Sequence, residues 1–329
     1  MNKVRMLLDP FILMLVGTVV LASILPARGG FVPVVGAVST AGIILLFFLH
    51  GAKLSRAAIL AGASNWRLHL AILAATYCLF PLLGLAVARL PIDPPLLASG
   101  LLYLTLLPST AMSSVALTAM ARGNVAAALC GASFSNLAGI FITPALVLLT
   151  MGGKGHGLSW QNAEEIALQM LLPFALGHML RPWIGGFVQH HKRLVTVVDR
   201  GAVLLVVYSA FGAAVVAGLW HHVSIGALLV VTLACCVLLA LVLVATWLAG
   251  RIMGLSREDA IVLIFCGSKK SLATGAPMAS ILFARADMGF IILPVMLFHQ
   301  IQLIVCALIA QHYAATAQDG PSSGVAARA

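Results

Sequence analysis

The chain has 329 residues, of which 62% are hydrophobic and only 9% are charged, and its mean hydropathy is +1.09. A soluble protein with a polar surface does not reach these values, so the composition indicates an integral membrane protein. The net charge of +10 comes from Lys and Arg residues scattered in short loops beside apolar runs. This pattern is typical of topology signals, and it argues against nucleic-acid binding.

At about 20 residues per span plus short loops, the apolar runs predict ten membrane helices. The first three cover about residues 10–25, 32–50 and 68–88, and Pro81 interrupts the third. The fourth begins near Leu96 and meets Pro108 partway, and the fifth covers about residues 124–151. The first half of the chain is therefore predicted to span residues 1–151.

A Gly-rich linker, residues 152–162, follows the first half, and a second half covers residues 163–314. Its spans are expected at about 163–180, a stretch ending at 219, 225–249, 260–283 and 288–310, before a polar tail at 315–329 that is expected to be disordered. Arg181-Pro182 is expected to open a basic loop that contains His190 and His191. His221 and His222 are also expected in a loop, and neither pair predicts a metal site.

Alternate threading of ten spans distributes the basic residues unequally. Thirteen Lys and Arg residues fall on the side of both termini and four on the other, with Lys269 and Lys270 inside a span. The positive-inside rule then predicts a multi-pass protein of the inner (plasma) membrane with both termini in the cytoplasm.

Two adjacent lysines, Lys269 and Lys270, lie near the middle of an otherwise apolar stretch. Each costs roughly 2.5–3.5 kcal/mol at the centre of a membrane helix unless it faces protein or water. An intramembrane charge of this kind predicts a functional site. The alternative is that both ammonium groups reach to an interface along their apolar stems.

The two halves repeat one polar pattern, which begins at Pro108 in the first half and at Gly267 in the second. After each break come a short basic turn and then further polar residues, with His299, Gln300 and Gln302 in the second half. Because five spans per half is an odd number, the second half enters the membrane inverted. Paired interruptions in inverted halves indicate the binding site of a transporter.

The two breaks carry hydroxyl groups that can act as ligands or donors. They are Ser109, Thr110, Ser113 and Ser114 in the first half, and Ser268, Ser271 and Thr274 in the second. The N-termini of half-helices favour anions, and the two lysines add positive charge, so the breaks predict an anion site. The alternative for each hydroxyl is a bond to the carbonyl four residues earlier in its own helix.

Other polar residues lie inside the spans that follow each break. Ser133 and Asn136 are candidates in the first half and His299 and Gln300 in the second, and the alternative is that these pairs only bond one another across a helix contact. The acidic residues are all expected in loops or at span ends. The predicted buried charge is therefore basic, where ion-coupled carriers commonly keep a carboxylate.

The chain resembles the bile acid:sodium symporter superfamily, most closely its SBF-like branch. The resemblance rests on residues 107–110 (Leu-Pro-Ser-Thr), 121–126, 49–54 and 265–272 (Phe-Cys-Gly-Ser-Lys-Lys-Ser-Leu), and it extends over essentially the whole chain. It implies an all-α membrane protein with ten transmembrane helices in two inverted five-helix repeats. It also implies that the broken fourth and ninth helices cross in a core domain beside a panel domain.

The resemblance also implies where a sodium ion would bind. The superfamily's sodium ligands match Ser113, Ser114, Ser133, Asn136 and Thr76. In the ninth helix, however, Phe265 replaces a Glu and Lys269 replaces a Gln. We therefore expect the Lys269 ammonium to take the place of a sodium ion, fixed by Ser113, Ser114 and the carbonyl groups of the breaks.

These features predict a secondary transporter that moves a small organic anion across the bilayer by alternating access. It would be independent of sodium, or coupled to protons if the lysine titrates, and it would need no cofactor. The alternative is a non-transporting regulator or scaffold that keeps the fold. An enzyme is not predicted, because the sequence has no carboxylate pair, metal cluster or nucleophile with a base. Arg122 and Asn124 are expected to cap the turn between the fourth and fifth helices.

Overall fold

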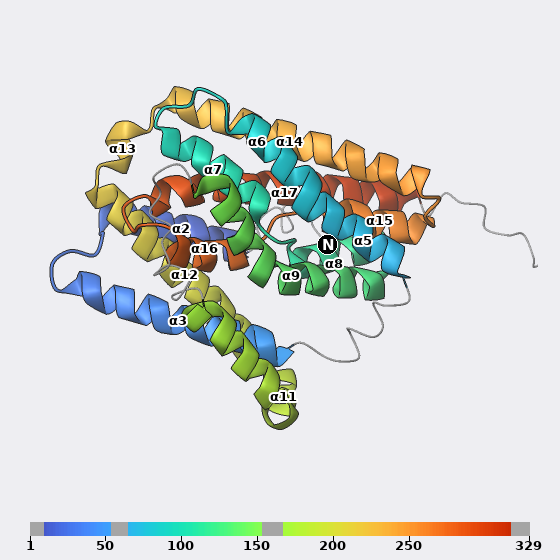
Figure 1. Cartoon of the computed structure of the whole chain (residues 1–329), viewed down its shortest axis with the longest axis horizontal. Helices are drawn as coiled ribbons and strands as arrows, with labels where there is room; N and C mark the ends of the chain where they lie inside the picture. Colours follow the sequence, from blue (N-terminus) through green and yellow to red (C-terminus); the bar gives the residue numbers. More distant parts are fainter. Residues whose placement is uncertain (1–9, 54–64, 153–166, 317–329) are drawn as a thin grey trace, which may run out of the picture.

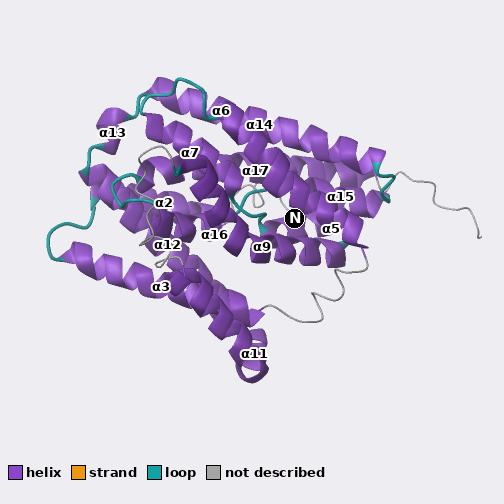
Figure 2. Ribbon diagram, viewed as in Figure 1, coloured by secondary structure: helices purple, strands orange, loops and turns teal. Residues whose placement is uncertain are grey.

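The structure is a computed structural model that describes residues 10–53, 65–152 and 167–316, and every regular element in these ranges is helical (Figure 2). The α-helices are α2 (Pro10–Ile24), α3 (Phe31–Lys53), α5 (Trp66–Ala74), α6 (Phe80–Val87), α7 (Pro95–Leu106), α8 (Ala111–Met120), α9 (Val125–Met151), α11 (Leu172–His190), α12 (Lys192–Val216), α13 (Leu219–His222), α14 (Ile225–Ile252), α15 (Arg257–Gly267), α16 (Leu272–Leu282) and α17 (Met288–Thr316). Two π-helical turns, η2 (Ala75–Leu79) and η3 (Ala167–Leu171), precede α6 and α11. Most of the predicted linker and tail lies outside the described residues.

The helices fit a multi-pass membrane protein. Within the described ranges, six helices are long and apolar enough to cross a bilayer, and α7 with α8, bent by 61° at their break, forms a seventh. Large apolar side chains point outward from these and neighbouring helices, such as Leu149 at 81% and Ile225 at 79% exposure. Such a surface suits lipid rather than water. The all-helical class is confirmed, and the arrangement as ten spans in inverted repeats stays a prediction.

One predicted boundary is wrong. The expected basic loop after residue 180 is helical, because α11 continues through Arg181 and Pro182 to His190. The apolar residues Trp183 and Phe187 extend the hydrophobic run beyond the proline, and membrane helices tolerate proline where neighbouring groups satisfy the freed carbonyls. His190 is therefore a helical residue. The pair 221–222 is helical as well, since it ends the short helix α13.

Pro81 does not interrupt the third predicted span, which stays helical and contains a wider, π-helical turn just before the proline. The helix passes from α5 through the π-helical turn η2 into α6, where the backbone N–H of Phe80 donates to the carbonyl of Ala75, five residues earlier. The next residue is Pro81, which has no N–H group. The carbonyl of Thr76 therefore lacks the backbone donor that would continue this pattern.

The helices pack as two groups that lie side by side (Figure 1). The four-helix group consists of α2, α3, α11 and α12, and the broken-helix group consists of α5 to α9 and α14 to α17. In the four-helix group, the backbones of α3 and α11 approach so closely that a Cβ atom on Gly51 would overlap the carbonyl oxygen of Phe174. A Cβ atom on Gly177 would overlap that of Phe48. Small residues commonly permit such contacts between membrane helices.

The two broken helices meet at their interruptions. One break separates α7 from α8 and the other separates α15 from α16, and the N–H of Ser271 donates to the carbonyl of Pro108 across 2.9 Å. The hydroxyl of Ser109 donates to the carbonyl of Cys266 at 2.6 Å, and that of Thr110 donates to Lys270 at 2.7 Å. Each break therefore satisfies backbone groups that the other leaves open, as hydrocarbon surroundings require.

Candidate functional site

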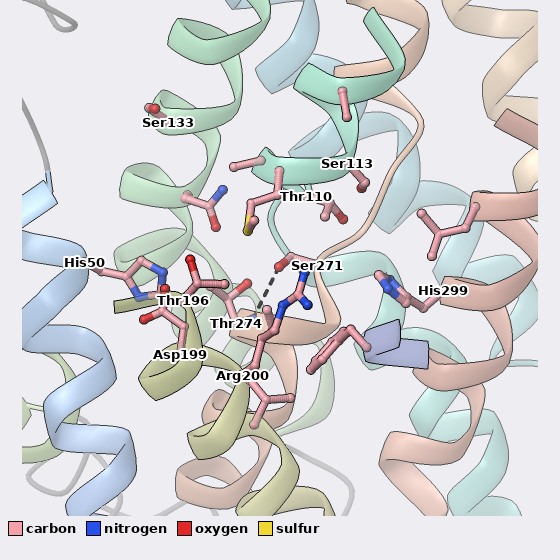
Figure 3. A pocket seen from close by; sticks show the side chains of 18 of the residues that line it. His50, Thr110, Ser113, Ser133, Thr196, Asp199, Arg200, Ser271, Thr274 and His299 are labelled. Carbon is pink, nitrogen blue, oxygen red and sulfur yellow. Dashed lines mark hydrogen bonds between the residues drawn. The ribbon is translucent and has the colours of Figure 1, made fainter. Parts of the chain in front are cut away.

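A cavity of about 820 Å³ lies between the four-helix group and the broken-helix group. Its walls come from α2, α3, α11 and α12 of the four-helix group and from α8, α9, α16 and α17 of the broken-helix group, and Figure 3 shows the labelled side chains that line it. Most of the wall is apolar, with residues such as Leu117, Ile140 and Leu303. This volume lies in the range of about 300–1,000 Å³ that is usual for small-molecule sites.

Seven of the thirteen predicted site residues line this cavity. They are Thr110, Ser113, Ser133, Asn136, Ser271, His299 and Gln300, and Thr274, the other hydroxyl named after Ser271 in the second break, lines the cavity as well. The other six, which do not line it, are Thr76, Ser109, Ser114, Ser268, Lys269 and Lys270. Those six residues are buried, and each exposes no more than 1% of its surface. The predicted site is thus divided between a cavity wall and a buried layer.

The hydroxyl groups also fall into two classes. Those of Thr76, Ser133 and Ser268 donate to the carbonyl four residues earlier in their own helices, which is the alternative given above for the hydroxyls of the breaks, such as Ser268. Those of Ser109 and Thr110 bond across to the other break. Ser114 does the same, since its Oγ donates to the carbonyl of Phe265 at 3.0 Å. The hydroxyls that join the two breaks thus belong to the first break.

Asn136 and His299 have identifiable contacts beside the breaks. The side-chain amide of Asn136 donates to the carbonyls of Ser109 and Ala132, both at 2.9 Å. His299 Nδ1 lies 3.0 Å from Nε2 of Gln302. Asn136 therefore supports the first break. His299 contacts Gln302, whose side-chain amide bonds the backbone N–H and carbonyl of Lys270 in the second break.

Lys269 lies directly behind the cavity wall. Its side chain is fully buried, and its Nζ atom donates to the hydroxyl oxygen of Ser113 at 2.6 Å. Ser113 is half-buried and faces the cavity. The predicted contact with Ser113 is confirmed. Only the Ser113 side chain lies between the Lys269 ammonium and the cavity along this contact.

Lys270 turns in another direction and ends in a cage of backbone oxygens. Its Nζ atom donates to the carbonyls of Thr76 and Thr105, both at 2.8 Å, and of Leu107 at 2.7 Å. The ammonium also lies 4.2 Å from the ring centre of Phe80. Only 1% of this residue is exposed, so the alternative that the lysines reach an interface is wrong.

Pro81 and the break after α7 account for the three free carbonyls. Pro81 cannot donate to the carbonyl of Thr76, as the π-helical turn would require. Near the end of α7, the N–H of Ser109 donates to the side chain of Ser135 rather than to the carbonyl of Thr105. Leu107 lies in the break itself, where its carbonyl has left the helix. The cage therefore depends on Pro81 in one span and on the break after α7 in another.

The predicted sodium ligands do not fit a sodium ion at the expected place. Sodium needs several oxygen atoms pointing at one centre, but the Ser133 hydroxyl bonds its own helix and that of Ser114 bonds Phe265. Ser113 already accepts from the Lys269 ammonium. Only part of the hypothesis for Lys269 therefore agrees with the contacts, because the carbonyls of the breaks surround Lys270 instead.

Several cavity residues were not predicted from the sequence. His50 and Lys53 line the cavity from α3, and Asp199 and Arg200 line it from α12 (Figure 3). Lys53 and Asp199 form an ion pair. Asp199 was expected at a span end without a role, and Lys53 and Arg200 were interpreted as topology signals. His50 and Lys53 lie in the last turn of α3, and Asp199 and Arg200 lie in the N-terminal half of α12, so the sequence alone did not show that packing brings them to one wall.

The charges on the cavity wall favour an anion. The Lys53–Asp199 pair is neutral as a unit, whereas Arg200 adds a positive charge that points into the cavity from α12 (Figure 3). On the opposite wall, the Lys269 ammonium lies behind Ser113 and donates to its hydroxyl group. Since the apolar walls screen charge poorly, these groups create a positive potential inside the cavity.

The turn between α8 and α9 has the predicted capping role. The side chain of Asn124 accepts from the N–H of Ala127 at 3.0 Å, which caps α9. Arg122 has a positive φ angle of 57° and ends the turn that follows α8. Together they allow the chain to reverse between α8 and α9.

Comparison with known proteins identifies the family. Residues 9–315 match the SBF-like CPA transporter family. The chain is 53% identical over 326 residues to an uncharacterized protein of Pseudomonas aeruginosa, with 98% of both chains covered. It is 52% identical over 313 residues to YfeH of Escherichia coli, with 94% of both covered.

A more distant relative is the sodium/bile acid cotransporter 7 of Rattus norvegicus, which is 25% identical over 277 residues, or 83% of this chain and 82% of that protein. The family is one of transporters, not of enzymes. The match covers both breaks and every helix that lines the cavity. The chain therefore belongs to the SBF-like CPA transporter family.

Proposed function

We propose that this protein moves a small organic anion with an apolar body across the inner membrane by alternating access. The observation that carries the proposal is the convergence of two helix N-termini, those of α8 and α16, on one cavity. Thr110 and Ser113 line it from the start of α8, and Ser271 and Thr274 line it from the start of α16. Both N-termini present N–H groups and a partial positive charge, which suit a carboxylate or a similar group.

The start of α8 supports this assignment. Thr110 precedes the helix but does not cap it, because its hydroxyl donates to the carbonyl of Lys270. The first N–H groups of α8 therefore lack this side-chain acceptor at the cavity wall. An anionic oxygen at this place would supply the missing acceptor.

Thr274 gives an independent indication of a ligand. Its side chain is 6% exposed, and within the described part of the chain its Oγ1 atom has no hydrogen-bond partner. Buried hydroxyl groups are normally paired. A bound anion would accept a hydrogen bond from this hydroxyl in the first turn of α16.

The substrate's body would lie along the apolar wall. Leu117, Ile140, Leu303 and Ile304 face the cavity beside the two N-termini. Arg200 and the Lys269 ammonium add positive charge on opposite sides. The proposed substrate is therefore an amphipathic anion rather than an inorganic ion.

Alternating access would result from movement between the two helix groups. The cavity extends to Lys53 at the end of α3 and to Arg200 in the N-terminal half of α12, which were both assigned to the side predicted to be cytoplasmic. Toward the other side, the Arg285 guanidinium packs against Gly36 near the start of α3. These contacts support an inward-facing state.

The proposal includes the ten-helix arrangement with both termini in the cytoplasm. Residues 1–151 and 163–314 would form the two inverted repeats, and the direct contact of their breaks supports this division. The broken-helix group would be the core domain and the four-helix group the panel domain. Movement of one group past the other would expose the cavity to each side in turn.

The test uses the purified full chain in proteoliposomes. Benzoate, octanoate and cholate would be offered, each beside its uncharged amide, with imposed sodium, proton or electrical gradients. We expect saturable uptake of at least one carboxylate but not of its amide. The same carboxylate should raise the unfolding temperature of the detergent-solubilised protein, because a ligand of the folded state stabilises it.

A folded protein that neither binds nor moves any of these carboxylates would overturn the proposal. That result would favour the alternative, a regulator or scaffold that keeps the transporter fold. Equal uptake of acids and amides would also contradict it, since the site would then not select for charge.

A further inference from the structure

We propose that the Lys270 ammonium is a covalently attached internal cation in a cage of three backbone oxygens, and that this cage binds sodium once the side chain is removed. With Lys270 in place, the wild-type carrier would operate without a sodium ion at the contact of the two breaks. This inference rests on the proposed function and specifies how transport is coupled. The cation in the cage is Lys270, whereas the sequence had assigned this role to Lys269.

The coordination of the ammonium is complete. A lysine ammonium has three N–H donors, and the carbonyls of Thr76, Thr105 and Leu107 accept one each at 2.7–2.8 Å. The ring of Phe80, 4.2 Å away, adds a face that attracts cations. The ammonium is therefore held as a coordinated ion would be, and it has no N–H left for a substrate.

The cage attracts a cation even without the lysine. Thr105 and Leu107 belong to the C-terminal end of α7, where the helix dipole is negative. Groups of backbone carbonyls replace the water shell of monovalent cations in other membrane proteins. If the cage were empty, three buried carbonyls would lose their partner, so an occupant of positive charge is strongly favoured.

The backbone of Lys270 is fixed on both sides. Gln302 Oε1 accepts from its N–H and Gln302 Nε2 donates to its carbonyl, both at 2.8 Å. The Thr110 hydroxyl donates to the same carbonyl. A free sodium ion could leave during each transport cycle, whereas this covalently attached cation cannot.

Lys269 offers a matched comparison. It is equally buried and adjacent in sequence, but within the described part of the chain its ammonium donates to a single hydroxyl group, that of Ser113 at the cavity wall. Its removal would leave no carbonyl cage. The two lysines therefore have different roles: Lys269 adds charge beside the substrate, and Lys270 occupies a cation site.

The experiment compares wild type, Lys270→Ala and Lys269→Ala by thermal unfolding in sodium, potassium or choline chloride at equal ionic strength. We expect Lys270→Ala to be destabilised and then stabilised by sodium, saturably and by about 2–4 °C. n-Propylammonium has the atoms that this substitution removes, so it should also stabilise Lys270→Ala, while n-propanol should not. Wild type and Lys269→Ala should respond to none of these ions.

Wild-type protein that is stabilised by sodium but not by potassium or choline would overturn the proposal. A folded Lys270→Ala that responds to neither sodium nor n-propylammonium would do the same. If that variant does not fold, wild-type carboxylate uptake decides the matter: it should be unchanged when choline replaces sodium, and a sodium requirement would refute the inference. The unfolding measurements contain no carboxylate, and chloride is the same in every arm, so they remain informative even if the protein transports no carboxylate.

Discussion

The side-chain amide of Gln302 pairs with both backbone groups of Lys270. Its oxygen accepts from the N–H and its nitrogen donates to the carbonyl, each at 2.8 Å, as a neighbouring strand would. Gln302 is fully buried on α17, next to the break that separates α15 from α16. One side chain therefore replaces the helix bonds that the unwound backbone has lost.

Gln302→Leu should destabilise the protein. The carbonyl of Lys270 would keep its bond from Thr110, but the N–H would be buried without an acceptor, which costs about 1–3 kcal/mol. Thermal or denaturant unfolding in detergent measures the loss. The control is Gln300→Leu, because Gln300 is half-buried and lies at the cavity wall. Equal effects of both substitutions would contradict the specific role of Gln302.

Thr274→Val should weaken anion binding without destabilising the ligand-free protein. The Thr274 hydroxyl is buried without a partner in the described residues, so its removal sacrifices no bond. A bond to the bound anion worth about 1 kcal/mol corresponds to roughly fivefold in affinity. The measurements are the unfolding temperature without ligand and the dissociation constant of the transported carboxylate.

Thr143→Val is the control for that substitution. The Thr143 hydroxyl is also buried, but it donates to the carbonyl of Leu106 at 2.8 Å and does not line the cavity. It should lower stability by about 1 kcal/mol and leave affinity unchanged. If Thr274→Val lowered stability instead of affinity, the hydroxyl would have an internal role and the anion site would lose its main support.

The breaks could be predicted from the sequence because their physical causes are local. Pro108 cannot continue the hydrogen bonds of a helix, and charges such as those of Lys269 and Lys270 cannot face lipid. The roles of the two lysines could not be predicted in the same way. The cage depends on Pro81, which lies in a different span and acts through a π-helical turn.

The four-helix side of the cavity was missed for a different reason. Lys53 ends α3 and Arg200 lies in the N-terminal half of α12, and basic residues outside the centre of a span usually indicate topology. Whether such residues face a cavity depends on the packing of α3 against α12, which requires contacts between distant parts of the chain. The same limit applies to Gln300 and Gln302, since two residues on one helix differ in direction and only the neighbours decide which is buried.

Asp259 should stabilise the contact between the starts of α5, α9 and α15. Its carboxylate accepts from the side-chain amide of Asn65 at 2.9 Å and from that of Asn124 at 3.0 Å. We expect Asp259→Ala to cost about 1–3 kcal/mol in unfolding free energy, because both donors lose a charged acceptor. Glu258→Ala is the control, since both carboxylates lie in the first turn of α15 and share its dipole. A similar loss in the two variants would assign the effect to the dipole alone.

Gly177→Leu should disrupt the packing of α11 against α3. A side chain at this position would overlap the carbonyl of Phe48, which is backbone and cannot rotate away. Overpacking of this kind typically costs about 1–3 kcal/mol, so the unfolding temperature and the yield of monodisperse protein should fall. Gly186→Leu, on the same helix, is the control because no atom lies within 4 Å of its added Cβ. Equal yields and unfolding temperatures for the two variants would show that α3 and α11 separate easily.

Lys53 and Asp199 should have opposite effects on anion affinity. They form an ion pair on the cavity wall, and their side chains are 35% and 20% exposed. Asp199→Asn would free a positive charge and should tighten carboxylate binding, whereas Lys53→Met would free a negative charge and should weaken it. Each change should amount to about three- to tenfold, because partly exposed charges at this range contribute roughly 1 kcal/mol.

The salt dependence distinguishes this electrostatic effect from a change in packing. Raising the ionic strength from 0.01 to 0.15 M shortens the screening length from about 30 to about 8 Å, so both shifts in affinity should shrink. The double variant Lys53→Met with Asp199→Asn removes both charges and should return affinity close to that of wild type. If both single variants weakened binding to the same extent, the ion pair would act by holding α3 against α12 rather than by balancing charge in the cavity.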